Sequence, residues 1–159
     1  MSALRIELLA EHPQAISPLA ILFESEWAPY YGEAGPGDAE SDLRASANRH
    51  ELPIALVAID DDIICGTAAL KQTSVSNFEE YSPWLAALVV AESYRGRGIG
   101  EQLVISVEAL AKRLGYGQIY VGTGEKSGLS ESLLQRRNWR FVDKSAYFVS
   151  EVRVYAKKL

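Results

Sequence analysis

The sequence predicts an α/β protein. Strand-type and helix-type patterns alternate along its 159 residues, which favours this class. Residues 84–90 form an almost continuous apolar run, typical of a central strand that is covered on both faces. Residues 99–114 carry the strongest helical stripe of the chain. The length suits one compact domain, so we expect residues 1–159 to form a single domain.

The N-terminal third is expected to contain a strand and two helices. Residues 4–9 alternate apolar and charged side chains, which indicates a half-buried strand. Ser17-Pro18 provides a cap followed by proline, so a helix is expected to begin there, with an earlier start near Pro13 as the alternative. Residues 30–37 hold three glycines and a proline and are expected to be a loop. The remaining predicted elements are a helix over 38–48, strands over 54–59 and 63–70, a strand over 118–121, a helix over 130–137 and strands over 139–145 and 149–156.

The long helix over 99–114 has a clear apolar side and a clear end. Its apolar residues recur at helical spacing, and Gly115 follows as a stop signal. Glu108 and Lys112 stand four residues apart off this stripe. We therefore expect them to pair on the exposed side.

Composition and charge exclude several classes of function. The formal net charge of −5 and the lack of a basic stripe with interleaved aromatic residues disfavour nucleic-acid binding. Cys65 is the only cysteine, so no internal disulfide is possible, and its apolar surroundings favour a buried, inert thiol. The three aspartates at 60–62 are expected to form a solvated turn, and no metal site is predicted. Without a signal-peptide pattern or a stretch of about 20 apolar residues, we expect a cytoplasmic protein with no membrane contact.

The junction between the central strand and the long helix carries the strongest chemical signal. Residues 90–101 lead from one element to the other through Arg95-Gly96-Arg97-Gly98-Ile99-Gly100. Glycines allow close approach of the backbone to a ligand, and the first turn of a helix presents unpaired amides at a positive dipole end. Together these features predict a phosphate site. The Walker-type string is absent, and Glu101 stands where a dinucleotide fingerprint requires glycine.

The spacing of Arg95, Gly98 and Gly100 fits Arg/Gln-x-x-Gly-x-Gly/Ala and resembles the Gcn5-related N-acetyltransferase (GNAT) superfamily. The predicted order of elements resembles that of the superfamily over almost the whole chain. Residues 83–100 look like its fourth strand and signature loop, and residues 133–139 look like a degenerate form of its late Phe-Tyr-x-x-x-Gly-Phe segment. The resemblance implies a mostly antiparallel seven-stranded sheet, splayed between strands 4 and 5 and flanked by about four helices.

The resemblance also implies acetyl-CoA as co-substrate. Main-chain groups of Leu88, Val89 and Val90 would hold the pantetheine arm, and an amide near Leu88 or Val90 would polarise the thioester carbonyl. The side chains of Arg95 and Arg97 are candidates for phosphate neutralisation, with plain solvation as the alternative. The backbone groups expected at the pyrophosphate are those of Gly96, Arg97, Gly98, Ile99, Gly100 and Glu101.

The catalytic residues of many relatives do not carry over to this chain. Leu134 occupies the position of the usual tyrosine acid, and Trp84 occupies that of a glutamate base. Glu80, with Glu79 and Tyr81 beside it, and Tyr147 near the final turn are candidate substitutes. For each, a solvent-facing or packing role is the alternative.

The acceptor site is expected near the first two helices. Trp27, Tyr30 and Tyr31 are candidate contacts for a cationic acceptor, with Glu24 and Glu26 nearby and core packing as the alternative for Trp27. The predicted activity is acetyl transfer to a primary amine of a small molecule or a peptide. A non-catalytic acyl-CoA-binding module, transfer of another acyl group and a homodimer stay open as alternatives.

Overall fold

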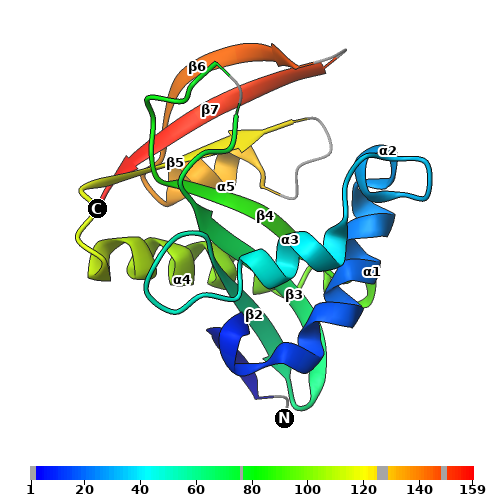
Figure 1. Ribbon diagram of the computed structural model, residues 1–159. Coiled ribbons are helices and arrows are strands. Elements are labelled where there is room, and N and C mark those ends of the chain that lie inside the picture. The colour runs from blue at the N-terminus through cyan, green and yellow to red at the C-terminus, as the bar shows by residue number, and fades with distance from the viewer. Residues whose placement is uncertain (1–2, 76, 125–128, 148–149) are drawn as a thin grey trace.

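The computed structural model describes residues 3–75, 77–124, 129–147 and 150–159, with the backbone alone for 146, 147 and 150 (Figure 1). Seven strands form one sheet in the order β1-β2-β3-β4-β5-β7-β6. The β4–β5 pair is parallel and every other neighbouring pair is antiparallel. The predicted class, a mostly antiparallel mixed sheet, is therefore confirmed. The strands are β1 (Leu4–Leu8), β2 (Ile54–Asp60), β3 (Ile63–Lys71), β4 (Trp84–Val90), β5 (Gln118–Thr123), β6 (Arg140–Tyr147) and β7 (Ser150–Lys158).

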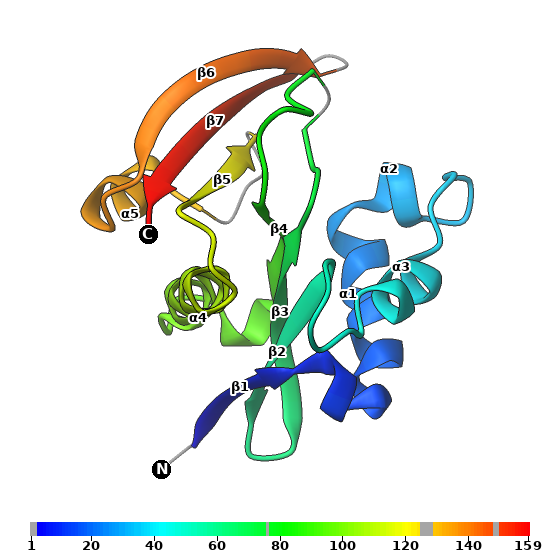
Figure 2. The ribbon, with the colours of Figure 1, turned by 60° about the vertical axis from the view of Figure 1, so that its left-hand side comes forward.

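Helices cover the two faces of the sheet unequally. The long helix α4 (Ile99–Arg113) packs across β2, β3, β4 and β5 on one face, whereas α1 (Ile16–Glu26) and α3 (Ala39–Ala45) cover the other face of the first half (Figure 2). The short helices α2 (Ala28–Tyr31) and α5 (Glu131–Arg136) complete the described set, together with three 3-10 turns. The central strand β4 consequently has a helical layer on each face, as its apolar run predicted.

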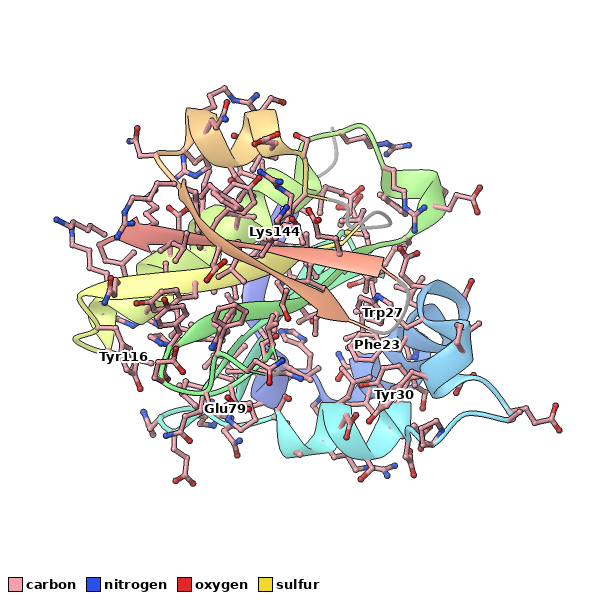
Figure 3. The ribbon with its side chains drawn as sticks, turned by 90° about the horizontal axis from the view of Figure 1, so that it is seen from above. Phe23, Trp27, Tyr30, Glu79, Tyr116 and Lys144 are labelled. Atoms are coloured by element: carbon pink, nitrogen blue, oxygen red, sulfur yellow. The ribbon has the colours of Figure 1, made fainter. Side chains whose placement is uncertain are left out.

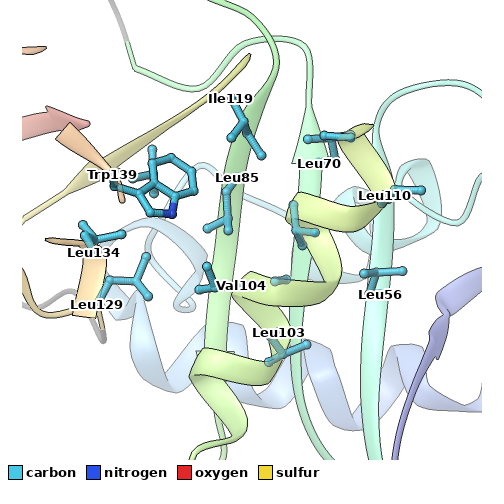
Figure 4. Packing of buried hydrophobic residues seen from close by; sticks show 14 of the residues in the cluster. Leu56, Leu70, Leu85, Leu103, Val104, Leu110, Ile119, Leu129, Leu134 and Trp139 are labelled. Atoms are coloured by element: carbon cyan, nitrogen blue, oxygen red, sulfur yellow. The ribbon is translucent and has the colours of Figure 1, made fainter. Parts of the chain in front are cut away.

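The apolar stripe of α4 forms the centre of the larger core. Leu103, Val107 and Leu110 are fully or almost fully buried, and they pack with strand residues such as Leu85 (Figure 4). Leu134 lies in the same cluster. A buried leucine of this kind contributes about 2 kcal/mol of transfer free energy, so this face holds α4 firmly against the sheet.

The first helix begins earlier than the Ser17-Pro18 pair indicated. A 3-10 turn over Pro13–Ala15 leads into α1 at Ile16, which agrees with the alternative start near Pro13. The expected loop also differs, because Tyr30 and Tyr31 lie in the one-turn helix α2 rather than in a loop. Pro29 stands in the first turn of α2, where its missing N–H costs nothing.

The expected pairing of Glu108 with Lys112 is wrong. Glu108 is buried, and its carboxylate accepts hydrogen bonds from Arg137 at 2.7 Å, Lys157 at 2.8 Å and Trp139 at 2.9 Å. Burial alone raises the pKa of Glu108, but these donors outweigh it and hold that pKa below its ordinary value. The middle of α4 is thereby tied to β7 and to the segment after α5.

Candidate cofactor and acceptor site

The parallel strands β4 and β5 pair only at their beginnings. Trp84 lies opposite Tyr120 and Leu85 opposite Val121, and no further register pair joins the two strands in the described residues. Figure 2 shows the strands diverging beyond this point. The edge of β4 that faces β5 is therefore without a strand partner from Ala86 to Val90. Apart from the Val90 carbonyl, which Arg95 engages, its main-chain groups are available to a ligand that lies along it.

A β-bulge interrupts β4 where it leaves β5. Ala87 and Leu88 stand together opposite Ala68, and Ala87 has a φ of 54°. Positive φ in a residue with a Cβ is strained and is found where the surroundings impose it. The bulge re-aims the backbone at Leu88, one of the two residues, with Val90, whose amide the family resemblance implies at the thioester. Nothing in the pattern of the apolar run 84–90 predicted it.

The loop between β4 and α4 has the conformation that its glycines allow. After a 3-10 turn over Glu92–Tyr94, Gly96 and Gly98 have φ values of 77° and 81°, and Gly98 caps the helix. A Cβ built on either residue meets no atom within 4 Å. These glycines are thus required by their backbone angles and not by close packing, and the space above them is open.

Six consecutive backbone amides at the end of this loop and the start of α4 are free to bind a ligand. The first helical bond of α4 runs from the Gln102 amide to the Gly98 carbonyl at 3.1 Å. In the part of the chain that the structure describes, the amides from Gly96 to Glu101 have no hydrogen-bond acceptor. A run of unpaired donors at the N-terminus of a 15-residue helix fits the diphosphate of a CoA-type cofactor.

The arginine side chains of the loop hold its shape from outside. The Arg95 guanidinium donates to the Val90 carbonyl at 2.9 Å and to the Glu26 carboxylate of α1 at 3.0 Å. Arg97 lies over the ring of Tyr94, 4.9 Å from its centroid. Both arginines are exposed beside the amides, so both add positive potential where phosphate is expected.

Comparison with known proteins agrees with this geometry. A family model described as the acetyltransferase (GNAT) family matches residues 19–138. The chain belongs to the GNAT acetyltransferase family. No curated protein sequence matches it significantly.

Solved structures share the GNAT fold along nearly the full chain. The aminoglycoside 6'-acetyltransferase type Ii is 21% identical with a TM-score of 0.77, over 97% of this chain and 96% of that one. An aminoglycoside 6'-N-acetyltransferase complexed with coenzyme A is 18% identical with a TM-score of 0.75, over 97% and 96%. The protein yncA from Salmonella typhimurium, solved with its cofactor acetyl-CoA, is 16% identical with a TM-score of 0.74, over 98% and 94%. At these identities the likeness establishes the fold.

The described residues of this GNAT chain contain neither a metal-binding group nor a membrane-spanning helix. Across residues 3–75, 77–124, 129–147 and 150–159, no three His, Cys, Asp or Glu side chains are grouped to hold a metal ion. Within the same ranges, no helix has the length and apolar character needed to cross a membrane.

The predicted acceptor aromatics lie together at the end of α1 (Figure 3). Trp27 packs edge-on against Phe23 with centroids 5.0 Å apart, so it contributes to the core beneath α2. Tyr30 is 51% exposed, whereas the Tyr31 hydroxyl donates to the Asp42 carboxylate of α3 at 2.7 Å. Burial, together with that hydrogen bond, raises the pKa of Tyr31 above its ordinary value, which keeps this phenol neutral. Tyr30 is thus the freer of the two tyrosines to contact an acceptor.

The sequence candidates for acid and base receive little support from their positions. Glu80 is exposed on the turn before β4, and the side chain of Tyr147 lies outside the described residues. Trp84 is fully buried and donates its indole N–H to the Tyr81 carbonyl at 2.7 Å. Leu134 is fully buried in the core beside α4. Glu80 and Tyr147 remain predictions.

A polar cluster on the α1–α3 face was not anticipated from the sequence. Lys71, the last residue of β3, lines a small cavity with Asp42, Ser46 and Thr67, and the bulge residue Ala87 faces the same space. Burial lowers the pKa of Lys71, and the field of Asp42 partly opposes that shift. A lysine that ends an apolar strand was the available signal. The Asp42 carboxylate that shares its cavity stands 29 positions earlier in the sequence, on a helix with a thin apolar face.

Proposed function

We propose that this GNAT chain transfers an acetyl group from acetyl-CoA directly to a primary amine of a small molecule or a peptide. The run of unpaired amides from Gly96 to Glu101 carries the proposal. This run lies at the end of the loop that joins β4 to α4. The loop follows the edge of β4 that has no pairing with β5. The two features together provide donors for a diphosphate and an extended main chain for a pantetheine arm.

Each part of the site has a definite task in this proposal. Acetyl-CoA supplies the activated acyl group. The amides of 96–101 bind its diphosphate, and the free edge of β4 positions its arm as an added strand would be positioned. The bulge at Ala87 and Leu88 aims one main-chain amide at the thioester carbonyl, where such a donor contributes about 3 kcal/mol to lowering the barrier.

A small-molecule amine is the favoured acceptor class. Structural neighbours include aminoglycoside 6'-acetyltransferases, whose names specify acceptors with several amines. On this chain, Glu24 and Glu26 belong to the last turn of α1 and precede the exposed Tyr30 in the sequence. Glu26 is paired with Arg95, so Glu24 supplies the negative charge that is left for a cation there. The net charge of −5 acts in the same direction.

A non-catalytic acyl-CoA-binding module is the second candidate function. It is favoured by the burial of Trp84 and Leu134, which stand where many relatives have a base and an acid. Such a module would use the same amides without turning over the bound cofactor.

Calorimetry and thiol release separate these functions. We expect the protein to bind CoA and acetyl-CoA in a 1:1 ratio, and to release free thiol from acetyl-CoA in the presence of an aminoglycoside or a polyamine. If acetyl-CoA binds but no amine of a broad panel causes thiol release, the protein is a non-catalytic acyl-CoA-binding module and not an enzyme. Absence of binding to CoA would overturn both.

A further inference from the structure

The side of β4 away from α4 contains an ionisable group with no direct partner. Lys71 is half-buried, and among the described residues no hydrogen bond or ion pair engages its ammonium group. The nearby carboxylate of Asp42 instead receives the Tyr31 hydroxyl. Burial penalises the charge of a lysine in such a place and lowers the pKa of Lys71, which makes its neutral, basic form easier to reach.

The cavity beside Lys71 reaches the bulge of β4. Its volume is about 10 Å³, which is close to the ~10–15 Å³ that one water molecule needs by this measure. Most of its lining is apolar, but the hydroxyl oxygens of Thr67 and Ser46, which donate to the Leu56 and Asp42 carbonyls, can still accept hydrogen bonds from one water. Ala87 also lines the cavity, and the neighbouring Leu88 is one of the two residues, with Val90, near which the thioester carbonyl is expected. Lys71 and the strand segment expected beside the reacting atoms therefore border one common cavity.

We infer that Lys71 accepts the proton of the acceptor amine, through one water in the cavity beneath Ala87. This inference rests on the proposed function. The proton leaves the ammonium nitrogen of the acceptor for the water, and the water passes a proton to the Lys71 amine. The freed nitrogen lone pair forms the bond to the acetyl carbon, the carbon–sulfur bond breaks, and the sulfur keeps that electron pair and takes the second amine proton. Lys71 then returns its proton to solvent.

The groups that surround Lys71 set the pH at which it can act. Asp42 faces it from α3 and raises its pKa, while Tyr31 of α2 stays neutral and holds the Asp42 carboxylate in place. Ala55 of β2, Ala69 of β3 and Ala87 of β4 contribute no charge. Lys71 should therefore titrate below the ordinary lysine value of about 10.4, nearer to the pH at which a general base is effective.

The decisive kinetic test is Lys71→Met, with Lys112→Met as the matched control on the exposed last turn of α4. We expect Lys71→Met to lower kcat with an amine acceptor about 100-fold or more, and to leave the affinity for acetyl-CoA unchanged by calorimetry. The rise of rate with pH should then follow the acceptor's own ionisation. Lys71→Arg should be equally impaired, because its guanidinium does not release a proton. A Lys71→Met enzyme with wild-type kcat, or with only the KM of the amine raised, would overturn the inference.

A second readout does not depend on turnover. In protein labelled with ¹³C at lysine Cε, the resonance missing from Lys71→Met identifies Lys71, and its titration gives the pKa directly. We expect that pKa to lie below 10.4 and to fall further in Asp42→Asn, which removes the opposing field; the kinetic pH profile should move the same way. A Lys71 that titrates like the exposed lysines would overturn the inference while leaving acetyl transfer intact.

If the unchanged protein binds acetyl-CoA but acetylates no amine, the proposed function itself fails, and this inference fails with it.

Discussion

The two faces of the sheet around β4 are built on different principles. On the α4 face, the candidate cofactor site consists of consecutive main-chain amides between Gly96 and Glu101. On the α1–α3 face, Tyr31, Asp42 and Lys71 come from three elements and meet only after folding. The α4 face binds through backbone groups at the start of a helix, and the spacing of glycines in the sequence predicts such a site. The α1–α3 face relies on side chains from separate elements, which come together only if the strands pair in the right register.

Stability should also divide between the two faces, and the α4 face should hold the larger share. The largest expected effect is that of Glu108→Gln, which leaves Arg137 and Lys157 next to a neutral amide in a buried site. Breaking a buried pair of this kind costs about 3–5 kcal/mol of unfolding free energy at pH 7. Urea denaturation measures it, and Glu40→Gln, in an exposed pair with Arg44, should cost under about 1 kcal/mol.

The pH dependence of Glu108→Gln gives a further check. Because the folded-state pKa of Glu108 is depressed, its stabilisation is present above the unfolded value of about 4.3 and is lost as the pH falls through the folded-state value. The difference between wild type and variant should shrink in that acid range. A constant difference from pH 7 to below pH 3 would mean that packing, and not charge, makes Glu108 important.

The second largest effect should come from Gly98→Val, which tests whether the cofactor face works through its backbone. Valine is strained at a φ of 81°, and its side chain would fill the space expected to hold phosphate. We expect the dissociation constant of CoA to rise about 100-fold, roughly 2.8 kcal/mol. Gly115→Val is the matched control, since Gly115 has a φ of 94° and equally open surroundings at the other end of α4. Equal weakening by both variants would show that general destabilisation, and not the loss of the cradle, lowers affinity.

A smaller effect, on the opposite face, is expected for the stability of Lys71→Met. The pKa of Lys71 is depressed by folding, so its charge opposes folding at pH values below the folded-state pKa, and this opposition fades as the pH rises toward about 10.4. The variant should therefore be about 1 kcal/mol more stable than wild type at pH 7, with the gap narrowing between those two pKa values. Thermal denaturation at pH 7, 9 and 10.5 measures this. A variant less stable than wild type at pH 7 would show that the lysine stabilises the fold.

The difference between the faces also explains what the sequence could predict. A continuous apolar run predicts strand 84–90, helical periodicity predicts the long helix, and residues 95–100 predict the ligand loop. Each of these signals lies within one contiguous segment. Glu108 was misassigned because its partners, Arg137, Trp139 and Lys157, lie on elements whose approach to α4 depends on the order of β5, β7 and β6. Lys71 was overlooked for the same reason, since its environment is created by α3 and by the bulge at Ala87.

The smallest expected effect concerns an ion pair that connects the two faces. Glu26, at the end of α1, binds Arg95 of the cofactor loop at 3.0 Å, and both side chains are partly exposed. Glu26→Gln removes a negative charge near the expected diphosphate and frees the Arg95 guanidinium to face it. We therefore expect CoA to bind about two- to threefold more tightly, with unfolding free energy changed by less than about 1 kcal/mol. The gain should fade as salt rises from 0.02 to 0.5 M in calorimetry, since the partners are solvated. A loss of affinity would instead mean that Glu26 holds Arg95 in the position that the loop needs, so that a residue on the acceptor face supports cofactor binding.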